Sequence, residues 1–494
     1  MLQTLKNAWS TKEIRSKILF TLFILLLYRV GTVIPVPFVE AQGFADNFGG
    51  TILDYMNVLS GGSFGTMTLF ALGVQPYINA SIIIQLLAVV FPKLGELGKN
   101  DKKKMNLITR IVTVVLAVIT AVGYYFLLRN GNEHVDTFLT HRAFSGNNAW
   151  LYGIVIVVCY TAGASLVMWL AERINERGIG NGISMILFAN IIAAVPSFVI
   201  KLTNLVIDTY SYNQDIRWKY ALVTTVFAVA LIAFLLALIA FVIYVTGSER
   251  RIPIQYAKKV VGRKMYGGQS SNLPIKLNMT GVMPIIFASS IVSFLPTLFQ
   301  ILESAGVITA DSGWHNFAVA IGSEGVIYPI SLFILIIGFA YFYTQISFDP
   351  IEVANNLKKN GGAIPGIRQG RPTADHIKKI LNKITLAGAL FLSFIAILPT
   401  ILGPHVFKHI LEWIYEGAYN VEAIAEQYAS YLGTYAETYA ESLAKSYAAQ
   451  NASYLTSVFT FGGTTLLIVV GVAIETFREL EAQLTMRNYK GFLN

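Results

Sequence analysis

Ser63 lies in a segment whose spacing could support nucleophilic chemistry. The segment GGSFG, Gly61 to Gly65, matches the G-x-S-x-G pattern, in which a tight turn presents a serine as a nucleophile. That serine needs a histidine within hydrogen-bond distance to accept its proton. All the histidines fall in expected loops or at the edges of apolar runs: His134, His141, His315, His376, His405 and His409. A histidine base at membrane depth is therefore missing, which argues against an intramembrane serine protease.

Other sequence motifs of catalytic, nucleotide-binding or metal-binding sites are also absent. It contains no G-x-x-x-x-G-K-[ST] phosphate loop, no H-E-x-x-H motif and no metal-spaced cluster of cysteine and histidine. We therefore expect neither an enzyme nor a bound cofactor or metal. Any driving energy must come from a partner.

Composition and hydropathy indicate a membrane protein. The chain has 494 residues, of which 54% are hydrophobic and 13% charged, with a mean hydropathy of +0.57. Soluble domains carry about 25% charged residues. Apolar runs long enough to span a bilayer recur along the chain. They predict an all-α membrane protein with ten transmembrane helices, at about 18–36, 76–91, 107–128, 151–171, 183–202, 220–246, 280–300, 327–348, 384–403 and 457–476.

The basic residues divide unevenly between the segments that connect these spans. Alternate segments hold 29 lysines and arginines against 7 in the other set. Cytoplasmic loops are enriched in lysine and arginine. The distribution predicts that both termini and the basic segments lie in the cytoplasm.

The ten spans divide into two groups of five, 1–207 and 218–494. Because five is odd, the second group enters the membrane from the opposite side, which permits two inverted halves around a central path. The second span of each half is irregular: 76–91 is short, and 280–300 contains Gly281, Pro284 and Pro296. Such paired, interrupted spans indicate the path between the halves.

The stretch before the short span is apolar but opens on Ser60, Gly61, Gly62 and Ser63. It is separated from the span by Gly73 and Pro76. Irregular backbone at membrane depth is tolerated only where protein or a water-filled cavity covers it. We therefore expect a broken, glycine-led half-helix inside the bundle.

A secondary transporter is the alternative that this architecture leaves open. Transporters usually hold ionisable residues deep within their spans. Here Arg29 is the clear exception, and Glu172 and Glu475 lie at span ends. The irregular spans are instead rich in isoleucine, and a hydrophobic constriction can close a pore by dewetting without gripping a solute.

Three connecting loops are long. The basic loops 247–278 and 349–383 interleave proline, glycine and aromatic residues with their charges, which favours protruding hairpins that dock a partner, although topology signals and anionic-lipid contacts are the commoner use. The external loop 404–456 carries tyrosines at helical spacing, which predicts an amphipathic helix on the membrane interface or against the bundle. A partner-binding surface is the other possibility for that helix.

Several motifs in order along the chain resemble the SecY family, the pore subunits of the bacterial protein-translocation channel. They are YRVGTVIPVP (28–37), SGGS followed by FALGVQPYINASIIIQLL (within 60–87), ERINERGIGNGIS (172–184), RRIPIQYAKK (250–259), LPIKLNMTGVMPIIFASSI (273–291), NLKKNGGAIPGIRQG (356–370) and FGGTTLLIVV (461–470). The external loop 404–456 departs from the family by its greater length, and the resemblance does not explain its tyrosines.

The resemblance implies a pore between two inverted halves, closed by a ring of aliphatic side chains and an external plug half-helix at about 54–72. By motif, the ring falls on Ile78, Ile82, Ile183, Leu187, Ile286 and Ile468, where Leu187 and Ile468 are open to a shift of one residue. The plug contains Ser60, Gly61, Gly62, Ser63 and Phe64. Ser290 and Phe294 occupy lateral-gate positions, where spans two and three face spans seven and eight.

The resemblance also implies partners. Docking positions for the motor ATPase SecA or the ribosome fall on Arg250, Arg251, Lys258, Lys259, Lys358, Lys359 and Arg368. The other partners that the resemblance implies are SecE- and SecG-type subunits, signal-sequence-bearing preproteins and membrane lipids. The expected function is a passive conduit for unfolded polypeptide across, and for apolar segments sideways into, the bacterial plasma membrane.

Overall fold

The computed structural model describes residues 2–40, 52–130, 137–140, 149–211, 217–256, 259–261, 264–266, 270–304, 327–418, 437–446 and 462–490, with isolated residues between these ranges. Its main helices are α1 (Leu2–Ser10), α2 (Lys12–Gly31), α3 (Ile52–Leu59), α4 (Gln75–Val90), α5 (Pro92–Asn100), α6 (Lys102–Asn130), α8 (Ala149–Arg177), α9 (Gly182–Ser211), α10 (Arg217–Gly247), α11 (Met283–Ser304), α13 (Ile327–Ser347), α14 (Pro350–Lys359), α15 (Arg371–Leu402), α16 (Lys408–Ala418) and α19 (Gly462–Lys490). Its strands are β1 (Glu249–Tyr256), β2 (Lys259–Val261), β3 (Lys264–Tyr266), β4 (Ser270–Lys276) and β5 (Gly362–Ala363).

Every predicted span overlaps a helix of this structure. Seven of the described helices are long and apolar enough to cross a membrane, and α4 with α5 makes an eighth if that bent pair counts as one span. The other two predicted spans correspond to α2 and α19, which also contain charged residues such as Lys17 and Arg478. The structure is therefore an all-α membrane protein, and the count of ten spans stays a prediction.

The short span α4 begins where the sequence indicated a break. Gly73 has a φ of +55°, a conformation that costs glycine little and other residues more, and Pro76 lies in the first turn of α4. At its other end the chain bends by 118° between α4 and α5, next to Pro92. With 16 residues, α4 is about 24 Å long.

The expectation of a glycine-led half-helix is wrong in its order. The helical part, α3, precedes the glycines and ends at Leu59, and residues 60–74 form successive turns. Gly61 and Gly62 have φ values of +69° and +89°, which end the helix instead of starting it.

The predicted position of this segment inside the bundle is confirmed. Ser63, Phe64 and Met67 are buried, and the hydroxyl of Tyr124 on α6 donates a hydrogen bond to the Phe64 carbonyl at 2.7 Å. Gly163 of α8 lies directly against the Leu69 carbonyl, so that a Cβ at this glycine would collide with it. Neighbouring helices thus cover the irregular backbone, as membrane depth requires.

The two basic loops join in one small sheet. β1 pairs antiparallel with β4 over Glu249 to Gln255, and with β5 through Gln255 and Tyr256. The hairpin predicted for 247–278 is therefore confirmed. The loop 349–383 differs, because it forms α14, β5 and the first turns of α15 instead of a hairpin. Ile252, Ile254 and Ile275 of the sheet are buried with apolar residues of α14 and α15, which fixes both loops to the bundle.

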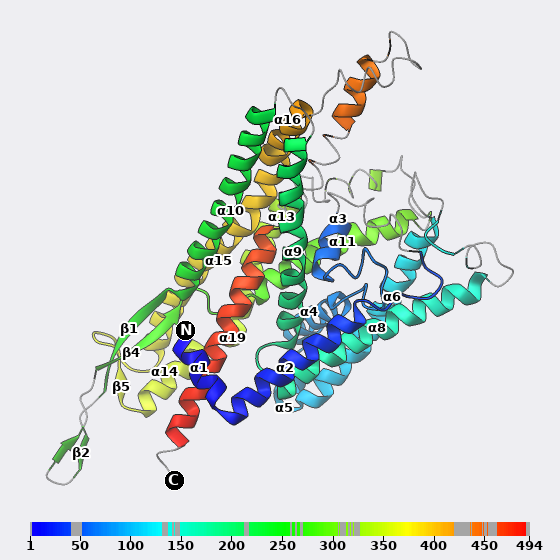
Figure 1. Cartoon of the computed structure of the whole chain (residues 1–494). Coiled ribbons are helices and arrows are strands. Elements are labelled where there is room, and N and C mark those ends of the chain that lie inside the picture. The colour runs from blue at the N-terminus through cyan, green and yellow to red at the C-terminus, as the bar shows by residue number, and fades with distance from the viewer. Residues whose placement is uncertain are drawn as a thin grey trace.

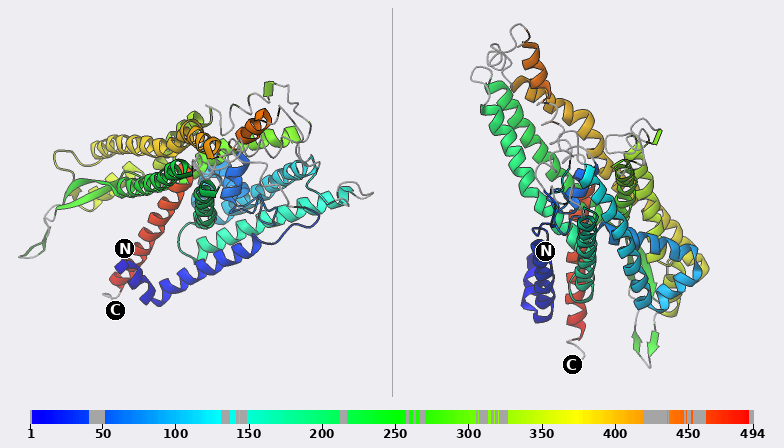
Figure 2. Two further views of the ribbon diagram at one scale, coloured as in Figure 1. Left: turned by 45° about the horizontal axis from the view of Figure 1, so that its top comes forward. Right: turned by 90° about the vertical axis from the view of Figure 1, so that its right-hand side faces the viewer.

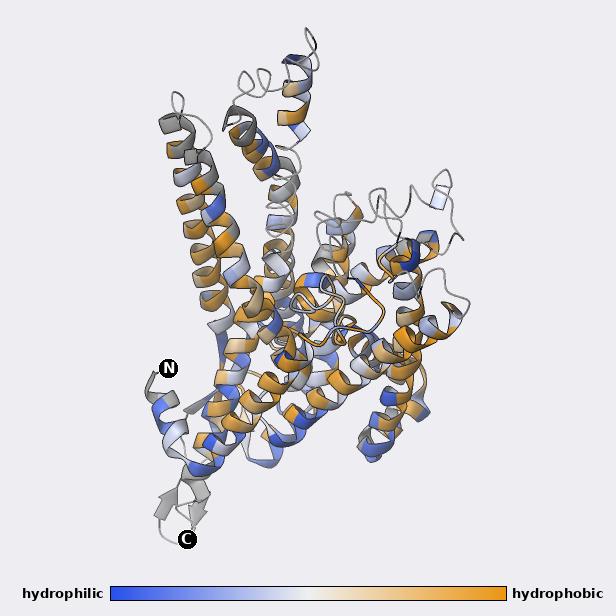
Figure 3. Cartoon of the chain, turned by 45° about the vertical axis from the view of Figure 1, so that its right-hand side comes forward, coloured by the Kyte–Doolittle hydropathy of each residue, from blue (hydrophilic) through white to orange (hydrophobic). Residues whose placement is uncertain are grey.

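The described ends of the chain, α14 and the strands lie at one end of the molecule, and α16 lies at the other (Figures 1 and 2). Hydrophobic residues cover the middle of the long helices, and hydrophilic residues gather toward the end that carries both termini (Figure 3). Isoleucine, leucine and valine side chains on the outer faces of these helices are exposed, Leu236 of α10 by 61% and Ile334 of α13 by 63%. Such faces suit contact with lipid.

The external loop 404–456 is described only in part, at residues 404–418, which include α16, and at residues 435, 437–446, 448 and 452. Tyr435 and Tyr439 are exposed, whereas Ala440, Ala444, Ala448 and Ala452 are buried. The helix 437–446 therefore turns Ala440 and Ala444 inward and Tyr439 outward. Of the other tyrosines of the loop, Tyr415 lies in α16 with its side chain outside the described part, and the remaining ones lie outside the described residues.

Candidate functional site

The aliphatic side chains assigned to the ring come together in one buried cluster. They come from α4, α9, α11 and α19, and their exposed fractions are small: Ile78 1%, Ile82 3%, Ile183 6%, Leu187 2%, Ile286 1% and Ile468 1%. Apolar groups that pack this closely leave no room for a continuous file of water, so the cluster can close a path through the bundle.

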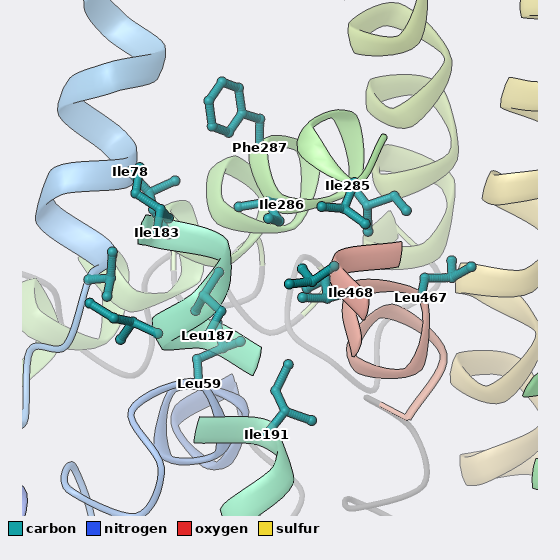
Figure 4. Packing of buried hydrophobic residues seen from close by; sticks show 14 of the residues in the cluster. Leu59, Ile78, Ile183, Leu187, Ile191, Ile285, Ile286, Phe287, Leu467 and Ile468 are labelled. Atoms are coloured by element: carbon teal, nitrogen blue, oxygen red, sulfur yellow. The ribbon is translucent and has the colours of Figure 1, made fainter. Parts of the chain in front are cut away.

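Figure 4 shows how these side chains are oriented. Ile78, Ile183, Leu187, Ile286 and Ile468 approach one another from their four helices. Ile468 and Leu467 point to opposite sides of α19, and Ile468 lies on the side of Ile286 and Leu187 (Figure 4). The orientation favours the assignment of Ile468.

Sequence reasoning missed other members of this cluster, among them Leu59 and Ile191. Leu59, the last residue of α3, lies below Leu187, and Ile191 lies one turn farther along α9 (Figure 4). A small cavity between α3, the following turns and Leu187 is lined in part by Met56, Leu59 and Val74. The signal for Leu59 was its place directly before the stretch Ser60 to Ser63. Thus α3 packs directly against one side of the aliphatic cluster.

The two residues assigned to the lateral gate lie on α11. Ser290 is 2% exposed, and Phe294 lines an apolar pocket enclosed by α3, α4, α6 and α11. The pocket also touches Asn79 of α4 and Ile119 of α6. Phe294 is therefore positioned where α4 and α6 face α11.

A hydrogen bond also connects α4 with α13. The hydroxyl of Tyr343 on α13 donates to Oε1 of Gln85 on α4 at 2.6 Å, and the Gln85 amide donates to Ser81 Oγ at 2.8 Å. The Tyr343 ring packs against Phe287, with ring centroids 5.3 Å apart. Sequence reasoning did not single out this pair, because a glutamine and a tyrosine 258 residues apart give no local pattern.

The basic positions assigned to docking lie at the surface of the two loops. Arg250 and Arg251 are exposed on β1, and Lys358, Lys359 and Arg368 are exposed on or after α14. Arg251 forms an ion pair with Glu249 at 2.8 Å. Lys258 and the Lys259 side chain lie outside the described residues. Partial burial, and to a lesser extent the Arg478 guanidinium, lower the pKa of Lys276, while the Glu249 carboxylate acts in the opposite direction.

The described side chains that could act as a nucleophile, a base or a metal ligand are not arranged for catalysis or metal binding. Ser63 Oγ is buried and has no hydrogen-bond partner among the described residues, so no base activates it there. Glu172, 7% exposed, forms an ion pair with Arg110 at 2.7 Å. Among the described residues, no group of three or more histidine, cysteine or acidic side chains could hold a metal ion.

Comparison with known proteins identifies the family. The SecY family model matches residues 68–416. The protein translocase subunit SecY of Streptomyces galbus is 38% identical over 508 aligned positions, which cover 100% of both chains. The chain belongs to the SecY family. Membership makes it a channel subunit of the bacterial plasma membrane with several membrane spans, and not an enzyme.

Solved SecY-like structures share the fold. A SecY channel whose plug domain is described as stabilising the closed state and maintaining a membrane seal matches with a TM-score of 0.54 and 17% identity, over 95% of this chain and 92% of the other. Sec61 from a canine ribosome–channel complex matches with a TM-score of 0.52 and 16% identity over the same shares. These structural similarities show that the chain has the fold of these channels.

Proposed function

We infer that the chain is the central pore-forming subunit of the Sec translocon, which passes unfolded secretory polypeptides across the bacterial plasma membrane and membrane segments laterally into it. The observation that carries this function is the convergence of aliphatic side chains from four helices, with α3 against them, in a member of the SecY family.

The proposed pore ring consists of Ile78, Ile82, Ile183, Leu187, Ile286 and Ile468. Aliphatic side chains offer no hydrogen bond to a passing chain, so every amino-acid sequence meets a similar surface. In the absence of a polypeptide the same side chains pack together and exclude water. The ring therefore combines tolerance for variable cargo with a closed resting state.

The proposed plug consists of α3 and the following turns, with Ser60, Gly61, Gly62, Ser63 and Phe64 at its centre. The contact of Leu59 with the ring supports this assignment. Because residues 60–74 form no regular helix, the segment can leave the ring without unfolding a transmembrane helix.

The proposed architecture is two inverted halves, 1–207 and 218–494, with both termini in the cytoplasm. The uneven distribution of lysine and arginine supports this orientation. In agreement with it, the described ends of the chain lie on the same side as α14 and the basic sheet (Figure 1).

The proposed lateral gate opens between α4 and α6 on one side and α11 and α13 on the other, with Ser290 and Phe294 at its edge. The bond between Tyr343 and Gln85 crosses this contact and must break when the two sides part.

Replacement of Tyr343 by phenylalanine is therefore expected to ease lateral opening. Interhelical hydrogen bonds in membranes contribute about 0.6–1.7 kcal/mol, which corresponds to about a three- to eighteenfold shift. Membrane segments of lower hydrophobicity should then integrate, as measured by protease protection of a graded leucine/alanine series. Tyr341→Phe is the matched control, because Tyr341 donates to the Asn382 carbonyl on α15 and not across the gate. Equal effects of the two variants would contradict the role of Tyr343.

The proposed partners are SecE- and SecG-type subunits, SecA, the ribosome, signal-sequence-bearing preproteins and membrane lipids. The exposed cations of the two loops support docking of SecA or the ribosome, since ribosomal RNA attracts such residues through its phosphates. The sheet that joins both loops to α15 places these cations on a rigid support.

Reconstitution tests the function as a whole. Vesicles that contain the chain with SecE- and SecG-type subunits should protect a signal-bearing precursor from external protease when SecA and ATP are added. A precursor without its signal sequence should stay accessible. Equal protection of both precursors, or none with active SecA, would contradict the proposal.

A further inference from the structure

Arg29, the cation that the sequence places within the first span, binds backbone carbonyls. Its Nη2 donates to the Ala189 carbonyl of α9 at 2.6 Å, and its Nη1 approaches the Gly61 carbonyl at 3.4 Å. Among the described residues no carboxylate pairs with this guanidinium. A charge at such depth requires compensating partners, and here they include the turn that follows α3.

Asn190, the next residue along α9, is fully buried and binds the same turn. Its Nδ2 donates to the Leu59 carbonyl at 2.7 Å and to the Tyr28 hydroxyl at 2.9 Å. The last carbonyls of a helix have no partner within the helix and carry partial negative charge. Asn190 and Arg29 therefore cap the end of α3 from two different helices.

The glycine at this turn fits closely between the two side chains. Gly61 has a φ of +69°, and a Cβ built there would lie 2.8 Å from Asn190 Oδ1 and 2.9 Å from Arg29 Nη1. Only a residue without a side chain lets the two groups reach the backbone. The contact is thus specific for the position that the turn occupies in this structure.

The same stretch of α9 also contributes to the aliphatic cluster. Leu187 and Ile191 flank Asn190 in sequence and pack in the cluster that contains Leu59. A shift of the turn away from α9 therefore breaks the polar contacts of Asn190 and the apolar contact of Leu59 together.

We propose that Asn190, Arg29 and Tyr28 form a latch that holds the plug in its closed position. The latch rests on the proposed function of α3 and residues 60–74 as a plug. Its members act as positioning residues: they set the equilibrium between the seated and displaced plug, and so how strong a signal sequence must be to open the channel.

A labelling experiment without any precursor tests the latch. Ser63 is fully buried in the plug, and cysteine closely matches serine in shape. In full-length protein reconstituted with SecE- and SecG-type subunits, Ser63→Cys in a Cys159→Ser background should react slowly with a membrane-impermeant maleimide. Asn190→Leu should accelerate this reaction about three- to eighteenfold, the effect of one interhelical hydrogen bond in a membrane. Arg29→Lys should accelerate it less, because an ammonium cannot bridge two carbonyls as a guanidinium does.

A second buried serine supplies the control for general loosening. Ser393 on α15 is 0% exposed like Ser63, and its hydroxyl donates to the Ala389 carbonyl of its own helix. In the same Cys159→Ser background, the labelling rate of Ser393→Cys should not change with Asn190→Leu or Arg29→Lys. Equal acceleration at Ser63→Cys and Ser393→Cys would indicate loosened packing and overturn the latch, as would an unchanged rate at Ser63→Cys in both variants.

A precursor series separates the latch from the proposed function. With a working latch and a translocation channel, Asn190→Leu should also admit precursors with weaker signal sequences. If labelling at Ser63→Cys becomes faster but precursors with weaker signal sequences are still rejected, the latch is supported and the proposed role of the plug in transport is contradicted.

Discussion

Replacement of Ile286 by asparagine is expected to make the resting channel leak ions and accept weaker signal sequences. Ile286 is 1% exposed at the centre of the aliphatic cluster (Figure 4). The substitution removes buried apolar surface and places an amide where the cluster offers no hydrogen-bond partner, a combined cost of about 2–4 kcal/mol. The open channel, whose ring is in contact with polypeptide or water, avoids most of this cost. The closed state should therefore lose about one to three orders of magnitude in relative population.

Ion flux and translocation both report this shift. Vesicles with Ile286→Asn should release a trapped dye or dissipate a potassium gradient without any precursor. Ile286→Leu should keep the seal because it preserves volume and polarity. Ile334→Asn is the control for an asparagine elsewhere in the membrane, since Ile334 on α13 is 63% exposed and lies outside the cluster. A sealed Ile286→Asn channel with unchanged signal stringency would contradict the assignment of the ring.

Charge reversal at Arg368, combined with Lys358→Glu, is expected to stop transport without opening the channel. Both side chains are exposed, and neither forms an ion pair among the described residues. Each reversal turns an attraction for an acidic or phosphate-bearing partner into a repulsion, and a partner contact of this kind is worth about 1–3 kcal/mol. We expect SecA-dependent translocation to fall at least about tenfold. Ribosome binding should weaken as well, and raised salt should reduce the difference between variant and parent.

A lysine outside the two loops provides the control. Lys104 is also exposed and lies in the first turn of α6, where it pairs with Asp101 at 3.3 Å. Lys104→Glu should leave translocation near its parent level, and neither change should cause dye leakage. Normal translocation by the double variant would contradict the docking assignment. If SecA-dependent translocation fails but ribosome binding does not weaken, this basic surface binds only SecA.

Local periodicity and composition predicted the spans because they depend on neighbours in sequence. Apolar runs gave a helix at each expected position, and Gly73 with Pro76 marked the start of α4. Gly61 and Gly62 led to the wrong order of helix and glycines within the plug, since a glycine run fits the start of one segment as well as the end of another. The φ of +69° at Gly61 decides that it ends α3.

Contacts between distant segments could not be predicted from the residues alone. The ring assignments depended on the family resemblance, because a single isoleucine in a span fits lipid contact equally well. The pairing of β1 with β5 joins loops about 100 residues apart, and nothing in either loop encodes its partner. Asn190 was overlooked for the same reason: its role arises from the Leu59 carbonyl, 131 residues away.

The most direct test of a polypeptide pore is a photo-crosslinking residue at position 286. Vesicles containing this variant would receive a secretory precursor stalled during SecA-driven transport. The account predicts crosslinks from position 286 to the mature part of the precursor that require SecA and ATP, and none from position 334 on the exposed face of α13. Absence of crosslinks at 286, together with solute uptake driven by an ion gradient in the same vesicles, would contradict the account and indicate a transporter.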